Sequence, residues 1–140
     1  MRHPLHPVLV HFPIACWSLA TVADLASLIW GEPAWRLAGV LLVAGIGFSI
    51  PAMLAGFLEL MKVPADSPAI KDVNRHMIVV MSALALYMAS LFLRLQGTRL
   101  IEPGLLAIGL SVAGFLLLCV AGWLGGRLVY GHRLGVSPPG

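Results

Sequence analysis

Charged side chains are scarce in this 140-residue chain, at 11% of its residues, and that scarcity excludes an ordinary soluble domain. Soluble globular proteins carry about 25% charged residues. The hydrophobic share is 59%, and the mean hydropathy is +0.94. A transmembrane helix needs about 20 mostly apolar residues, and the sequence supplies four such segments. We predict helices over residues 8–30, 34–61, 77–95 and 103–124.

The connections between these segments are too short to form a separate soluble domain. The sequence therefore predicts an all-α, integral membrane four-helix up-down bundle, with residues 1–140 as one domain. The first segment is too long for the apolar region of a signal peptide, and no small-residue cleavage pattern follows it. We interpret it as a helix of the mature protein, preceded by an HPLHP segment (residues 3–7) across one end of the bundle.

Catalytic motifs are also missing. The sequence contains no nucleophile–base–orienter set, no phosphate-binding loop and no HExxH zinc motif, so an enzyme has little support. The net charge of +3 suits anionic lipid headgroups, and no basic stripe with aromatics points to nucleic acid. The only cysteines, Cys16 and Cys119, lie inside predicted helices, where a thiol usually acts as a small hydrophobic side chain.

All five histidines fall at one membrane face when the four segments are threaded through a bilayer. His3, His6 and His11 precede or open the first segment, His76 opens the third, and His132 follows the fourth. We call this face the histidine end. Imidazole is a common ligand for haem iron and transition metals. The gathering therefore indicates a redox or metal-binding protein.

His11 and His76 are the best pair for axial ligation, because each lies about one turn inside a helix at the same depth. The first and third helices of an up-down bundle are diagonal, so the two imidazoles are expected to face each other and bind a b-type haem. The alternative is that they are interfacial histidines. Glu59 either accepts the ring N–H of a ligating imidazole or pairs with Arg75.

His3 and His6 lie in the HPLHP segment, whose prolines prevent a regular helix before Pro7. This segment should lie extended or folded across the mouth of the bundle. Four roles are open to it: capping a cofactor, supplying a ligand, binding Zn or Cu together with His132, or anchoring the chain at the interface.

Polar residues inside apolar segments need partners. His76 and Arg94 are 18 residues apart, which returns a helix to the same angle, and Tyr87 lies near that line. Asp24 in the first helix lies at a depth comparable with Arg94. We predict an Asp24–Arg94 ion pair, with either a structural role or a role as a proton relay.

Small residues mark contacts between membrane helices. The second helix carries Gly45 and Gly56 on one stripe, and the fourth carries Gly122 and Gly126 in GxxxG spacing. These glycines either pack helices within one chain or make room for a macrocycle or a partner's helix.

The distribution of basic residues indicates the orientation. The histidine end holds six, against three at the other end (Arg2, Lys62, Lys71, Arg75, Arg127 and Arg133 against Arg36, Arg94 and Arg99). By the positive-inside rule, both termini are predicted to face the cytoplasm.

Several motifs resemble a bacterial membrane family, the domain-of-unknown-function 2231 family. They are the opening HPLHPVLVHFPI (residues 3–14), Asp24, the pair Arg75-His76, and GGRLVY (residues 125–130) followed by Gly135-Val136. The chain has GFLE (residues 56–59) where relatives tend to show Gly-Leu-x-Asp, and Val80 where relatives often carry Asn. The resemblance covers essentially the whole chain.

The resemblance implies a four-helix protein of the bacterial inner membrane. Some relatives look to be joined to Rieske-type iron–sulfur domains, which favours electron transfer and a redox partner. Two hypotheses follow: a bis-histidine haem b protein, or a cofactor-free accessory subunit of a larger membrane complex.

Overall fold

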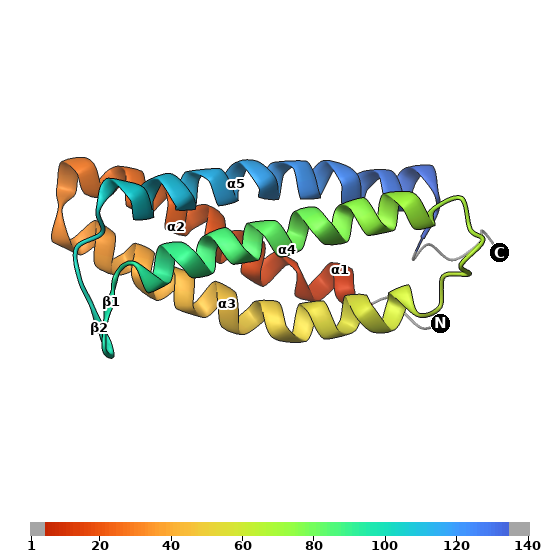
Figure 1. The fold of residues 1–140 in the computed structure, drawn as a ribbon, viewed down its shortest axis with the longest axis horizontal. Helices are drawn as coiled ribbons and strands as arrows, with labels where there is room; N and C mark the ends of the chain where they lie inside the picture. The colour runs from red at the N-terminus through yellow and green to blue at the C-terminus, as the bar shows by residue number, and fades with distance from the viewer. Residues whose placement is uncertain (1–4, 135–140) are drawn as a thin grey trace.

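The computed structural model describes residues 5–134 and consists mainly of long antiparallel helices (Figure 1). They are α2 (His11–Trp30), α3 (Glu32–Leu60), α4 (Ile70–Phe92) and α5 (Leu105–Gly126). Four helical stretches are long and apolar enough to cross a membrane: His6–Trp30, Glu32–Leu60, Ile70–Phe92 and Leu105–Gly131. The prediction of an all-α four-helix membrane bundle is confirmed.

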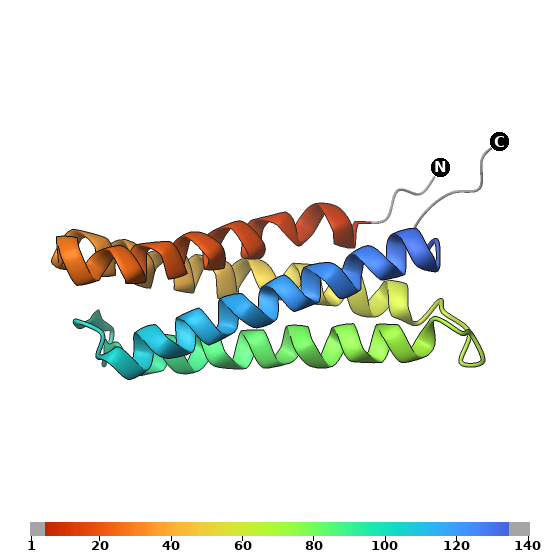
Figure 2. The ribbon, with the colours of Figure 1, turned by 90° about the horizontal axis from the view of Figure 1, so that it is seen from above.

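The bundle consists of two helical hairpins. Gly31 joins α2 to α3 with φ +66°, a conformation that glycine adopts without a steric penalty. The hairpins α2–α3 and α4–α5 pack against each other through α2–α5 and α3–α4 contacts, and α5 crosses the bundle obliquely (Figure 2). Trp17, Ala20, Leu42 and Tyr87 form the buried core between them.

Two helix boundaries differ most from the prediction, and the third helix also ends earlier, at Phe92 rather than at residue 95. The third helix begins at Ile70 rather than at residue 77, because the polar stretch before His76 continues the same helix beyond its apolar part. The fourth does not end near residue 124. It runs through Gly126 and continues as a π-helix, η1 (Arg127–Gly131). Hydropathy detects only the part of a helix that lies in lipid, so it does not detect the start of α4 or the continuation into η1.

A small β-hairpin between α4 and α5 was not predicted. Strands β1 (Leu95–Gln96) and β2 (Arg99–Leu100) pair antiparallel, with Gly97 (φ +61°) in the two-residue turn. The Leu100 side chain occupies a notch at Gly39 of α3, where an added Cβ would lie 2.6 Å from Leu100 Cδ1. This contact fixes the hairpin against the end of the bundle opposite the histidines.

The short helix α1 (His6–Leu9) precedes α2 and packs against α3. Pro7 lies in its first turn, where the missing N–H costs no helical hydrogen bond. Val10 separates α1 from α2 as a turn residue. Where the sequence suggested an extended or folded-over segment, the described end of HPLHP (residues 5–7) enters a helix that packs on α3, at the same end as η1 and the α3–α4 connection (Figure 1).

Candidate functional site

The imidazole of His6 lies on the surface of α3. Its Nδ1 is 2.8 Å from the main-chain oxygen of Ala52, and the ring covers Gly56, one turn further along. A Cβ at Gly56 would lie 2.8 Å from His6 Nδ1, so only glycine leaves room for the ring. The main-chain N–H of His6 donates to Glu59 Oε1 at 3.2 Å. His6 is therefore held by both its ring and its backbone.

His76 repeats this arrangement on the other hairpin. Its Nδ1 is 3.0 Å from the main-chain oxygen of Ala121 in α5, and its ring lies over Gly125, again one turn further along. The sequence contains the same spacing in both places, an alanine followed four residues later by a glycine.

The two hydrogen bonds fix the tautomer of each ring. A carbonyl oxygen only accepts, so Nδ1 of His6 and Nδ1 of His76 must carry the hydrogen. The Nε2 atom of each neutral ring then keeps its lone pair. A histidine whose Nδ1–H is bound to a carbonyl while Nε2 stays open is the arrangement that metal and haem ligands use.

His11 occupies a different position from the one expected. It is exposed, and its Nδ1 lies 3.3 Å from the main-chain oxygen of Val8 in the preceding turn. Of the described N-terminal histidines, His6 rather than His11 is thus the half-buried one. His3 lies outside the described residues.

Glu59 and Arg75 follow neither of the two expectations. Glu59 accepts from the backbone of His6 rather than from an imidazole. Arg75 lies 3.6 Å from Asp72, one turn earlier on α4, instead of pairing with Glu59. The expected orienting carboxylate therefore stabilises the N-terminal end of α1.

Asp72 is the centre of an ion-pair cluster that the sequence did not reveal. Arg127 Nη2 donates to Asp72 Oδ2 at 3.0 Å, and His132 Nε2 lies 3.0 Å from the same oxygen. Asp72 is buried, and these contacts hold η1 against the start of α4. In the sequence, only the i, i+3 spacing of Asp72 and Arg75 indicated an ion pair here. The other two partners are 55 and 60 residues away along the chain.

Asp24 and Arg94, expected to pair, are in contact and fully buried. Arg94 Nη1 donates to Asp24 Oδ1 at 2.6 Å, and Nη2 donates to Oδ2 at 3.1 Å, a bidentate geometry. Arg94 also donates to the main-chain oxygen and the hydroxyl of Ser90, and Ser90 Oγ donates to Ala107 O at 2.6 Å. One carboxylate and one hydroxyl thus connect α2, α4 and α5.

A second polar group lies nearer the middle of the bundle. Thr21 Oγ1 is 3.1 Å from Tyr87 Oη and 3.0 Å from Ser111 Oγ. The Tyr87 ring stacks on Trp17, with centroids 5.1 Å apart. Of the expected stripe on α4, Tyr87 and Arg94 are fully buried, while His76 is half-buried. Thr21 and Ser111 are too short and too common in membrane helices to be identified from sequence.

The glycines fall into two classes. Gly45 faces Trp17 and Gly56 faces His6, so both allow close packing within the chain. Gly122 and Gly126 do not, because no atom of the described chain lies within 4 Å of the place where their Cβ would be. The cysteines are both free, with Cys16 half-buried and Cys119 exposed.

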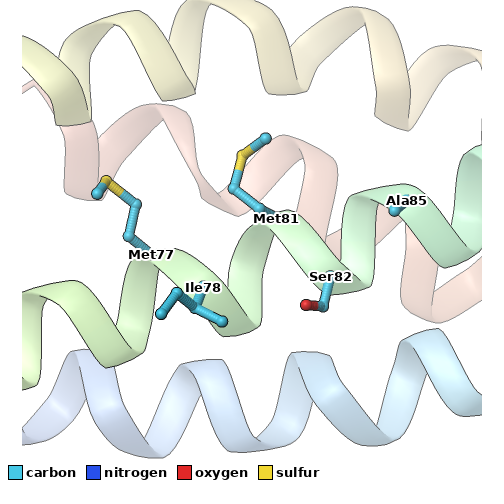
Figure 3. A pocket seen from close by; sticks show the side chains of 5 residues that line it. All are labelled: Met77, Ile78, Met81, Ser82 and Ala85. Atoms are coloured by element: carbon cyan, nitrogen blue, oxygen red, sulfur yellow. The ribbon is translucent and has the colours of Figure 1, made fainter.

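An open hollow of about 380 Å³ lies along the histidine half of α4 (Figure 3). All of its lining residues belong to that helix: Met77, Ile78, Met81, Ser82 and Ala85. Such an apolar surface suits a lipid chain. Within residues 5–134, no three side chains of His, Cys, Asp or Glu lie close enough to hold a metal ion. His6 contacts Ala52 O and His132 contacts Asp72, and the suggested Zn or Cu site stays a prediction.

Comparison with known proteins identifies a family. A family model described as "Predicted membrane protein (DUF2231)" matches residues 2–138, nearly the whole chain. No curated protein and no solved structure matches.

Proposed function

The chain belongs to the DUF2231 family, described as predicted membrane proteins, and from the positions of two histidines we propose that it binds a b-type haem and transfers electrons in the membrane. His6 and His76 are the proposed axial ligands, in place of the His11–His76 pair that the sequence suggested. The supporting observation is the matched pair of imidazoles, one from each helical hairpin, with Nδ1–H bound to a carbonyl.

Two features of the rings support this proposal. The ring of His6 occupies the space that Gly56 leaves, and the ring of His76 lies against Gly125, so each imidazole packs on bare helix backbone. Neutral imidazoles with open Nε2 atoms are the form that ligates iron, and bound haem would supply one-electron chemistry. The contacts to Ala52 O and Ala121 O hold each ring in orientation and raise its basicity as a ligand.

Absorption spectroscopy tests the proposal. Protein purified from haem-replete cells is expected to show a Soret band, a low-spin spectrum and about one haem per chain. His6→Ala and His76→Ala should each lose the low-spin form, because each removes one axial ligand. His11→Ala is the matched control, since His11 lies at the same end but is exposed. It should keep the spectrum.

Two results would contradict the proposal. A colourless, iron-free preparation of folded protein rules out haem binding. A low-spin spectrum that survives His6→Ala and disappears in His11→Ala returns the ligand role to His11.

The outward position of Gly122 and Gly126 favours a second candidate, an accessory subunit that packs against a partner's helix. In that case Gly122→Leu should reduce assembly strongly, because the added side chain blocks close approach of helices. Gly109→Leu is the control, as Gly109 lies on the same helix with equally open space around it. Complex size in native electrophoresis measures the effect, and an unchanged complex in Gly122→Leu argues against this contact.

A further inference from the structure

An open groove of about 710 Å³ lies where α5 passes into η1. Its lining combines aromatic, basic and glycine residues: Trp123, Gly126, Arg127, Tyr130, Gly131 and His132. Gly126 and Gly131 contribute no side chains to the groove, whereas the side chains of Trp123 and Tyr130 are 63% and 88% exposed. Neither His6 nor His76 lines this groove.

The length of α5 places the groove at the membrane surface. At about 1.5 Å per residue, a helix of 22 residues extends about 33 Å, close to the ~30 Å thickness of the hydrocarbon core. The C-terminal end of α5 therefore reaches the level of the lipid headgroups. Tryptophan and tyrosine are enriched at that level in membrane proteins, and the exposed side chains of Trp123 and Tyr130 fit this position.

The charge in and beside the groove is positive. Asp72 is the one carboxylate in the described cluster, and it faces Arg75, Arg127 and His132. Two guanidinium groups against one carboxylate leave an excess of one positive charge even with His132 neutral. This excess attracts anions to the site.

Arg127 is the group best placed to bind that anion. Its guanidinium lies over the Trp123 ring, 5.1 Å from the centroid, which holds it along the groove wall. Nη2 donates to Asp72, while the side chain as a whole is 46% exposed. A guanidinium has five N–H donors, so the contact with Asp72 leaves donors available for phosphate oxygens.

We propose that this groove binds the phosphodiester headgroup of an anionic phospholipid. Arg127 donates to the phosphate, and Trp123 and Tyr130 contact the glycerol region. A net-negative lipid fits better than a zwitterionic one, because the site carries excess positive charge and contains no free carboxylate to meet a choline. The groove would hold the histidine end at a fixed depth in the membrane.

Native mass spectrometry of the full chain tests this site. Protein in neutral detergent is titrated with phosphatidylglycerol and, separately, with phosphatidylcholine. Phosphatidylglycerol should bind several-fold more tightly. Arg127→Gln should weaken its binding about fivefold, the factor that corresponds to about 1 kcal/mol per basic residue near an anionic surface. Arg99→Gln, which removes an exposed charge at the opposite end, should leave the affinity unchanged.

Arg127 also holds Asp72, so Arg127→Gln can loosen η1 itself. Tyr130→Ala is the second variant, because this exposed side chain can be removed without disturbing the core. It should lower phosphatidylglycerol affinity about twofold to fivefold, within the range of an interfacial aromatic contact, with an unchanged circular dichroism spectrum.

Equal affinity of the wild type for the two lipids would overturn the proposal. So would equal losses in Arg127→Gln and Arg99→Gln, or full affinity in Tyr130→Ala. Soluble sn-glycerol 3-phosphate is the competitor that separates the sources of phosphate. If millimolar amounts displace phosphatidylglycerol, the site recognises a free phosphate ester and the assignment to lipid is wrong.

Discussion

Replacing Asp24 with asparagine is expected to lower the free energy of unfolding by about 3–5 kcal/mol, the cost of breaking a buried ion pair on one side. Both partners have side chains that are 0% exposed, and their oxygen and nitrogen atoms approach to 2.6 Å. Arginine keeps its charge in proteins. The variant therefore leaves a positive charge inside the bundle with no countercharge.

The remaining contacts of Arg94 hold its guanidinium inside the bundle. Its Nε donates to Ser90 O at 3.1 Å and its Nη2 to Ser90 Oγ at 2.7 Å, so the guanidinium stays in place when Asp24 is lost. Arg94 also lies in the short connection between α4 and the β1–β2 hairpin. Movement of Arg94 toward water would disturb that connection as well.

Unfolding in mixed detergent micelles, followed by tryptophan fluorescence, measures the effect. The matched control is Glu32→Gln, which breaks the Glu32–Arg36 pair at the start of α3. Both of those side chains are 61% exposed, and such pairs contribute little to stability, so the control should leave unfolding unchanged. If Asp24→Asn is no more destabilising than Glu32→Gln, the buried pair does not stabilise the fold. A folded, stable variant would then favour the proton-relay role for Asp24.

The sequence was sufficient for the four spans and for the Asp24–Arg94 pair, for related physical reasons. A run of about 20 apolar residues has one stable solution in lipid, a helix that satisfies its own backbone. Two opposite charges at the same depth inside such helices then have few other partners, so depth alone suggests the contact. Helical periodicity further indicated that Arg94 and Tyr87 share a face, and both are buried.

The histidine end was harder to predict, because local breaks in helices change the direction of side chains. Helix α1 begins at His6, inside the segment whose prolines suggested a non-helical chain. This helix places the ring of His6 against Ala52 of α3. The Asp72 cluster depended on the continuation of α5 into η1, which lies beyond the predicted end of the fourth helix at residue 124. Both features arise from contacts between segments far apart in the sequence.

Gly45→Ala is the second substitution with a large expected effect, a destabilisation of about 1–3 kcal/mol from overpacking. A Cβ at this position of α3 would collide with Trp17 Cδ1 and Nε1 of α2. The indole has little room to retreat, because it is 3% exposed and stacks on the fully buried Tyr87 at a centroid distance of 5.1 Å. The same micelle unfolding experiment measures the loss.

Gly47→Ala provides the control, since Gly47 lies on the same helix with nothing within 4 Å of its Cβ position. Alanine there should be neutral or slightly stabilising, because it favours the helix more than glycine does. The cause is tested by adding Trp17→Phe, whose smaller ring leaves space for the new methyl group. If the clash is responsible, the double variant loses less than the sum of the two single losses. Strict additivity, or a Gly45→Ala protein as stable as Gly47→Ala, would show that the α2–α3 interface does not depend on this notch.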